Sequence, residues 1–422
     1  MSIRKITLPG VLLASALFAV PAPAQAASGD EVFLAAGLRG ANEVGAKGDA
    51  DGRSTVVLKI SGNEITFAAR WNKIGAPAAG HVHLGAKGAN GDVKLDFFTK
   101  PLPKTVLGVT GTVKTDAELV KSLVDDPGGF YANLHDAAHP KGAVRGQFHR
   151  LSKPIDLNGV LHGSDQATLS AHADGGQGIQ ESDGKKRGDQ DGQAVWWLRP
   201  NGSSIAYTAS WSGLGAVTGG YLRKGAPGKN GPVAAALFAG ALPDNLTGVA
   251  GQAPVAAKVV KRIAADPGRY YVNLGDSVRG QLSDRPFTHP RALTAEVLRG
   301  SQIYSCAQQP SGGYAFTQLG VTAKLRREID HSFVTPSSGP PQWIAPDGSA
   351  VRGAVVTRTP NGDGNIPELV LDATQSGAKG GLLAHTTQIL RLNTTNGAAP
   401  TGTCTPGTEI KVPYGADYLF LG

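Results

Sequence analysis

Short runs of alternating apolar and polar residues cover much of the chain, and this period of two is typical of β-strands. Residues 55–60 (TVVLKI) and 65–71 (ITFAARW) flank a Ser-Gly-Asn-Glu turn, which predicts a β-hairpin. Residues 131–136 and 144–150 alternate in the same way and predict two more strands. The pattern therefore predicts a mainly β protein.

One helical signal interrupts these strands. Thr115 and Glu118 have the spacing of a capping box, and apolar residues follow at positions 119, 120 and 123. An Asp-Pro-Gly sequence at 126–128 ends the helical pattern. We therefore expect one short helix among the strands.

The same pattern occurs twice, with an offset of 140 residues. The matching pairs are ITFAARW with IAYTASW, GAKGANG with GAPGKNG, and DPGGFYANL with DPGRYYVNL. Long-period self-similarity is typical of duplicated domains. We predict two tandem antiparallel β-sandwich-like repeats, residues 28–150 and 154–285, each with a short helix. Within the second, the polar, glycine-rich residues 173–193 predict an exposed, disordered loop.

Further short apolar runs follow the repeats and predict a C-terminal β-rich domain over residues 295–422. The chain has two cysteines, Cys306 and Cys404, which are 98 positions apart. An exported chain meets oxidising conditions, so we expect them to form a disulfide. A catalytic dithiol would need closer spacing.

The first 26 residues have the pattern of a Sec-type signal peptide. Arg4 and Lys5 precede an apolar stretch from Ile6 to Val20, and Ala24-Gln25-Ala26 fits a cleavage site after Ala26. No later stretch is apolar for long enough to predict a membrane span. We therefore expect a secreted or periplasmic protein.

The net charge of the chain does not change these predictions. The formal net charge of +8 is modest for 422 residues, and it lacks the clustered basic and aromatic residues that nucleic-acid binding needs. An extracellular or envelope protein or polysaccharide is the expected class of partner.

Two histidines, His81 and His83, stand two residues apart in GHVHLGAKGANG. Residues at this spacing share one face of a strand, and imidazole nitrogens suit copper or zinc. His135 is the candidate third ligand. These three residues form a candidate metal site, with copper or zinc as the possible cofactor.

A structural or incidental role is the alternative, because a histidine before a glycine turn can simply bond the neighbouring backbone. The second repeat carries Tyr221, Arg223 and Gly275 at the three matching positions. Both repeats instead retain a set of polar residues to which we assign structural roles: Asn90, Arg145 and Gln147 in the first, and Asn230, Arg279 and Gln281 in the second. The Asn-Gly pairs are expected to supply turns with positive φ, and the arginines to pin strands together.

The segments GHVHLGAKGANGDV and FYANLHDAAHPKGAVRGQF resemble the chordin-type (CHRD) domain, and the second repeat resembles a divergent member. The resemblance implies an extracellular β-sandwich module and little chemistry, since these modules are not known as enzymes. The C-terminal segments, among them QIYSCAQQPSGGYAF and VPYGADYLFLG, resemble an uncharacterised family of secreted bacterial and fungal proteins. Glu368 stands where that family pattern leads us to expect an aromatic residue.

The chain has no Gly-x-Ser-x-Gly, His-Glu-x-x-His or phosphate-loop motif. A triad could be drawn on paper from Asp330, His331, Ser332 and His385, but such sets occur in any chain of this length. We therefore expect no catalytic residues and two functional hypotheses. One is an exported non-enzymatic binding or structural protein, and the other is a copper- or zinc-binding redox or metal-handling protein.

Overall fold

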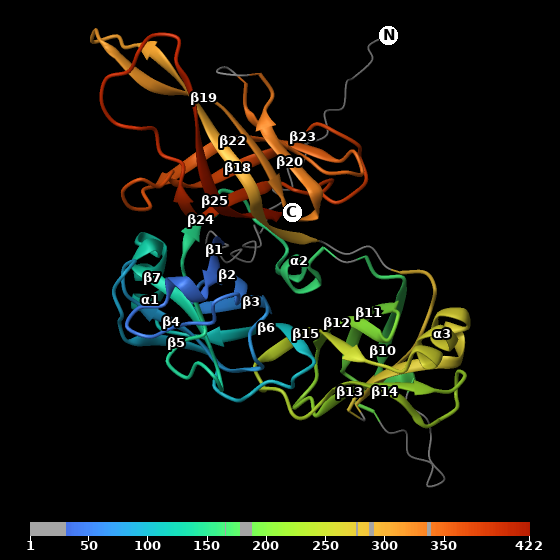
Figure 1. The fold of residues 1–422 in the computed structure, drawn as a ribbon. Coiled ribbons are helices and arrows are strands. Elements are labelled where there is room, and N and C mark those ends of the chain that lie inside the picture. Colours follow the sequence, from blue (N-terminus) through green and yellow to red (C-terminus); the bar gives the residue numbers. More distant parts are fainter. Residues whose placement is uncertain (1–30, 165, 178–187, 276, 287–290, 336–338) are drawn as a thin grey trace, which may run out of the picture.

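The computed structural model describes residues 31–164, 166–177, 188–275, 277–286, 291–335 and 339–422. The predicted signal peptide, residues 1–26, lies outside the described residues. Figure 1 shows three parts: the first repeat in blue and teal, the second in green and yellow, and the C-terminal domain in orange and red. The fold is mainly β, as the alternating pattern predicted.

In the first repeat, which we call module 1, the strands join antiparallel in the order β5-β4-β7-β8-β1-β2-β3-β6 and curl around a common core. Phe67 and Phe97 stack inside that core, with ring centroids 4.7 Å apart. Its elements are β1 (Val32–Arg39), β2 (Arg53–Ser61), β3 (Glu64–Asn72), β4 (Pro77–Leu84), β5 (Val93–Phe98), β6 (Val106–Lys114), α1 (Ala117–Asp125), β7 (Phe130–Asp136), β8 (Val144–Gln147) and β9 (His149–Arg150).

The predicted hairpin and helix are both present. Strands β2 and β3 pair from Ser61↔Glu64 onward, and Gly62 in the turn between them has φ +56°. The cap of α1 differs from the prediction, because Asp116 is the N-cap and its carboxylate accepts the Leu119 amide at 2.7 Å. A carboxylate in this position satisfies a free amide as well as a threonine hydroxyl would.

Module 2, the second repeat, repeats this strand order as β14-β13-β16-β17-β10-β11-β12-β15. Strands β10 and β11 remain paired as far as Asp174↔Gln193, inside the predicted loop, and residues 178–187 of that loop lie outside the described residues. The elements are β10 (Leu169–Asp174), β11 (Gln193–Asn201), β12 (Ser204–Ser212), β13 (Gly219–Lys224), β14 (Val233–Ala239), β15 (Leu246–Pro254), α3 (Ala257–Ala265), β16 (Tyr270–Leu274) and β17 (Val278–Gln281).

The two modules share one continuous sheet, because β6 pairs antiparallel with β15. These strands are equivalent in the repeat, and Val109 lies opposite Val249, its own counterpart 140 positions later. Antiparallel pairing of equivalent residues places a local two-fold axis between them, as in an isologous dimer.

The C-terminal domain is a closed antiparallel barrel of eight strands. The predicted disulfide is confirmed: Cys306 and Cys404 are bonded, with Cα atoms 5.8 Å apart. The strands are β18 (Ala292–Gln308), β19 (Tyr314–Leu325), β20 (Ile329–Phe333), β21 (Pro341–Ile344), β22 (Ala350–Thr359), β23 (Glu368–Gln375), β24 (Gln388–Asn396) and β25 (Glu409–Leu421).

A separate apolar cluster holds the barrel against module 1. Phe33 and Val57 of module 1 pack in one buried cluster with Leu390 and Leu419 of the barrel. The short helix α2 (Leu157–His162) contributes Val160 and Leu157 to the same cluster, and in Figure 1 it lies where the three parts meet. None of the helices in the described ranges is long and apolar enough to cross a membrane.

Candidate metal centre

The three candidate histidines meet at one face of the β4–β7 pair. His81 and His83 lie two apart on β4, and antiparallel β7 brings in His135, which is registered opposite Ala79. One ligand nitrogen from each side chain lies within 4.8 Å of the other two. The spacing on β4 could be read from the sequence, whereas the position of His135 depends on the strand register.

Each ring has an acceptor on the side away from the cluster. His83 Nδ1 lies 3.0 Å from Gly91 O, and His135 Nδ1 lies 3.1 Å from Pro140 O. Carbonyl oxygens only accept hydrogen bonds, so each Nδ1 carries the proton and each Nε2 is left with a free lone pair. His83 Nε2 is buried and has no hydrogen-bond partner.

In His81 the two ring nitrogens have the opposite arrangement, with Nδ1 and not Nε2 facing the cluster. Its Nε2 lies 3.5 Å from Asp96 Oδ1, and its Nδ1 lies 3.2 Å from His135 Nε2. A proton on Nε2 would serve the carboxylate and leave Nδ1 with a lone pair that faces the other two nitrogens.

Burial keeps this cluster uncharged. Desolvation lowers the pKa of His81 to about 4, and the neighbouring His135 lowers it further while Asp96 opposes the shift. Desolvation also lowers the pKa of His83 and of His135 below the ordinary histidine value. At neutral pH all three rings are therefore neutral, which is the state that ligates metals.

Tyr131 and Arg145 form a supporting layer that packs against the His83 ring. This ring stacks on Tyr131 at 4.7 Å, and the Arg145 guanidinium lies 3.4 Å above the centre of the same phenol ring. Arg145 Nη2 also donates to the carbonyl oxygens of Ala86 (3.1 Å) and Ala89 (2.6 Å). The loop after β4 is thus fixed to β8, the strand that carries Arg145.

The comparison with known families fits this architecture. The model of the CHRD domain matches residues 34–148 and 169–282, more than half of the chain. The chain belongs to the CHRD family. Residues 286–422 match a second family, described as a protein of unknown function (DUF3455). Both resemblances drawn from the sequence are therefore confirmed. No curated protein and no solved structure matches the chain.

The second CHRD module keeps the supporting layer and lacks the histidines. Arg279 lies 3.9 Å above the ring of Tyr271, and its Nη2 donates to Ala226 O (3.1 Å) and Lys229 O (3.2 Å). Arg223, at the position of His83, donates to Gly231 O at 3.4 Å. The layer is therefore part of the CHRD framework and does not depend on the imidazoles.

Both CHRD modules also keep a glutamine that closes the base of this loop. Gln147 Nε2 donates to Gly85 O (3.0 Å) and Gly128 O (2.8 Å). Gln281 makes the equivalent contacts with Gly225 O (3.0 Å) and Gly268 O (2.7 Å).

The expected positive φ of the Asn-Gly pairs is wrong. Gly88 and Gly228 take that conformation, with φ +81° and +72°. Gly91 is needed for a different reason, since a Cβ there would lie 1.5 Å from Leu84 O. Asn90 links two segments: it accepts a hydrogen bond from Arg145 Nη1 (3.0 Å) and donates to Val44 O (2.9 Å). Asn230 has a longer contact, 3.5 Å, with the hydroxyl of Tyr271.

A second group of possible ligands lies nearby: Asp49, Asp136 and His139. The carboxylate of Asp136 already accepts hydrogen bonds from the amides of Gly75 (2.8 Å), Ala138 (3.0 Å) and His139 (2.7 Å). These bonds hold its pKa below the ordinary value although burial alone would raise it. This group closes a turn.

The hypothetical triad in the DUF3455 domain does not form around His331. That ring is buried, stacks on Trp343 at 4.4 Å, and contacts Gln342 O through Nδ1 at 2.9 Å. Ser332 is the next residue of β20 and so points to the opposite face. Its hydroxyl accepts a hydrogen bond from Gln342 Nε2 at 3.1 Å.

Proposed function

We propose that this protein is an exported, non-enzymatic binding or structural protein whose first CHRD module holds one copper or zinc ion on His81, His83 and His135. The observation that carries the proposal is the orientation of the three rings. His83 and His135 each have a carbonyl acceptor for Nδ1, His81 Nε2 lies 3.5 Å from the Asp96 carboxylate, and one ligand nitrogen of each ring lies within 4.8 Å of the other two.

The spacing of the nitrogens supports a shared ion. Nitrogens bound at 2.0–2.1 Å to one tetrahedral ion lie about 3.3 Å apart. His81 Nδ1 and His135 Nε2 are already 3.2 Å apart. Two lone pairs at that distance repel each other unless a proton or a cation lies between them.

The surroundings supply what histidine ligands need. Metal-bound imidazoles commonly donate their remaining N–H to a carboxylate or a carbonyl, which fixes the tautomer and the ring orientation. Asp96, Gly91 and Pro140 provide those acceptors here. The buried, partnerless Nε2 of His83 would gain a partner on binding, which removes the cost of a desolvated acceptor.

Three protein ligands leave the fourth position of a tetrahedral site for water or for a group on a binding partner. Imidazole suits both copper and zinc. The signal-peptide pattern and the CHRD modules support a role outside the cytoplasm, with an envelope or extracellular protein or polysaccharide as the partner class.

The test is titration of the mature chain with Cu²⁺ and with Zn²⁺ by isothermal calorimetry, followed by electron paramagnetic resonance of the copper form. We expect one ion per chain with nitrogen hyperfine structure, and loss of at least about 100-fold in affinity in the H81A/H83A variant. The matched control is H172A, which removes a half-exposed histidine of module 2.

Equal affinity in the H81A/H83A variant and in the H172A control would overturn the metal proposal. Circular dichroism and urea unfolding in EDTA show whether each variant is folded. The variant H135N, which keeps a hydrogen-bonding side chain, gives a second reading of the same site. Turnover of a redox or hydrolytic substrate that a point change abolishes would overturn the non-enzymatic part.

A further inference from the structure

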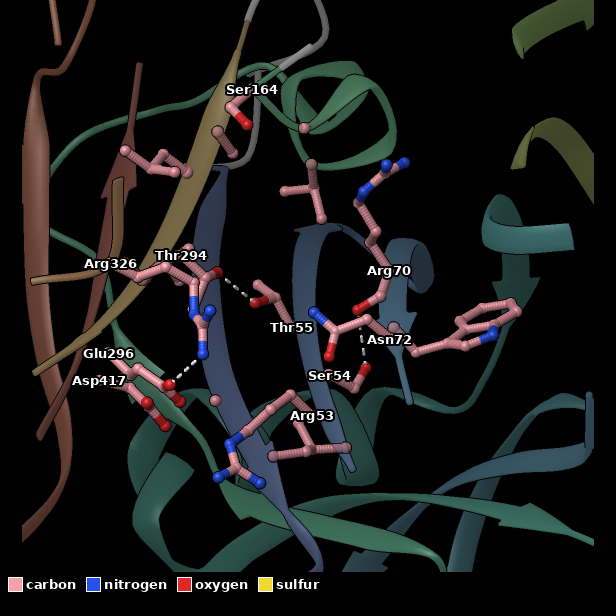
Figure 2. A pocket seen from close by; sticks show the side chains of 18 of the residues that line it. Arg53, Ser54, Thr55, Arg70, Asn72, Ser164, Thr294, Glu296, Arg326 and Asp417 are labelled. Atoms are coloured by element: carbon pink, nitrogen blue, oxygen red, sulfur yellow. Dashed lines mark hydrogen bonds and ion pairs between the residues drawn. The ribbon is translucent and has the colours of Figure 1, made fainter. Parts of the chain in front are cut away.

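A cavity of about 560 Å³ opens between module 1 and the DUF3455 barrel. Its walls come from β2 and β3 of module 1, from the end of α2, and from β18 and β25 of the barrel. Figure 2 shows the side chains of Arg53, Thr55, Asn72 and Arg326 around this space. Cavities of this size hold small organic molecules.

Part of the cavity lining is apolar. Leu107 and Val160 contribute to it from module 1 and α2, and Leu293, Leu392 and Leu419 contribute from the barrel. A bound molecule would therefore bury an aliphatic or aromatic body against this wall.

The rest of the lining carries charged side chains, and more of them are basic than acidic. Arg53, Arg70, Lys73, Arg326 and Arg327 line the cavity, against Asp51, Glu296 and Asp417.

Each of the three carboxylates already has a cationic partner. Asp51 pairs with Lys73 at 3.0 Å. Glu296 pairs with Arg326, and Asp417 pairs with Arg39. None of these three carboxylates is therefore paired with Arg53.

Most polar groups in the lining also bond to the protein. Thr55 and Thr294 join their hydroxyls across the cavity at 3.1 Å, and Ser54 Oγ donates to Arg70 O at 3.0 Å. Arg70 Nη1 donates to Leu161 O at 2.6 Å.

Arg53 differs from these groups. Its Nη1 donates to the neighbouring Gly52 O at 2.7 Å, and its Nε is buried with no hydrogen-bond partner. No carboxylate of the described ranges pairs with it. A guanidinium that lines a cavity and has no carboxylate partner is suited to binding the carboxylate of a ligand.

We propose that this cavity binds a small organic carboxylate with an apolar body, with the carboxylate on Arg53 and the apolar body against the leucine wall. The site uses none of the three histidines, so it stands or falls independently of the metal proposal. It also gives the contact between the CHRD module and the DUF3455 barrel a function, because both parts are needed to form it.

The test is calorimetric titration of the full mature chain with octanoate, octanol and acetate. We expect octanoate to bind, and to bind about tenfold or more tightly than octanol, which lacks the charge, or acetate, which lacks the apolar body. The variant R53Q should bind octanoate no better than octanol. Gln193 occupies the equivalent position in module 2, so this side chain is compatible with the strand.

Two further variants separate the contributions. L107W, which fills part of the cavity from a partly exposed position, should weaken octanoate and octanol alike. R352Q removes an exposed arginine of the barrel and should change neither. Octanoate binding that is equal in wild type and R53Q would overturn the role of Arg53, and failure of octanoate to bind wild type would overturn the site.

Discussion

The contact between Glu368 and His149 gives a quantitative prediction about how the barrel is held on module 1. Glu368 Oε2 lies 3.1 Å from His149 Nε2, and the two side chains are only 10% and 9% exposed. Burial alone would raise the pKa of Glu368, but the hydrogen bond and charge of His149 outweigh burial and hold it below the ordinary value. Glu368 also accepts the Asn393 amide at 2.7 Å.

Removing one partner of a buried pair leaves the other desolvated, which costs about 3–5 kcal/mol. We expect E368A to lower the free energy of unfolding by this amount. E368Q keeps an amide oxygen for the Asn393 amide and loses only the charge, so about 2 kcal/mol is expected.

The assay is urea unfolding at pH 6, followed by tryptophan fluorescence, for E368Q, H149Q and the double variant. A coupling free energy of about 1.5–3 kcal/mol is expected from the double-mutant cycle. The control is K153M, which removes a pair with Asp372 at 3.3 Å near the same interface, where the side chains are 43% and 35% exposed. That exposed pair should contribute no more than about 1 kcal/mol. Additive effects of E368Q and H149Q would refute the reasoning, since two groups that do not interact show no coupling.

Three other predictions concern single modules. Burial raises the pKa of Glu43 to about 7, although its hydrogen bond from Asn133 opposes the shift. The folded state therefore binds a proton more tightly than the unfolded state, and the free energy of unfolding falls as the pH rises from about 4.5 to 7. E43Q should raise the free energy of unfolding by about 1–2 kcal/mol at pH 8 and by little at pH 4, as measured by paired urea titrations. R145K should destabilise module 1 by about 1–3 kcal/mol, because a lysine cannot both stack on the phenol ring of Tyr131 and bond two carbonyls. R279K should give a similar loss in module 2. Thermal melts of the two variants that match the wild type would contradict the shared framework. The C306S/C404S variant opens a loop with a sequence separation of 98, worth about 4–5 kcal/mol in the chain-entropy model, and calorimetry should show its effect in the barrel transition.

The elements that depend on neighbouring residues could be predicted from the sequence. The β2–β3 hairpin follows from the alternation of residues 53–72 and a glycine in the turn, both of which are local. The duplication could be found because the loop after β4, its glycines and the Arg-Gly-Gln sequence are determined by backbone geometry. Only glycine at 91 avoids a clash with Leu84 O, so a close approach of two backbone segments appears in the sequence as a glycine.

The contacts between modules could not be predicted, because they depend on register and on docking. Nothing near Val109 indicates that β6 pairs with β15. Glu368 stood out in the sequence as a departure from its family pattern. Its reason is visible only in the fold, where a carboxylate and not an aromatic ring meets His149 across the interface.

The difference between the two modules can be traced to a short segment. Module 1 has six more residues than module 2 between the strand asparagine (Asn133 or Asn273) and the Arg-Gly-Gln sequence. In module 1 these residues form the turn that places Pro140 O against His135 Nδ1. Module 2 lacks this acceptor and has Gly275 there, with φ +51°, a conformation that a histidine would adopt only with strain. Substituting histidines into the β13 positions alone would therefore supply two ligands and no third. A three-histidine site requires the longer turn, which is why the framework of the CHRD module can be kept in both copies while the candidate metal centre is present in one.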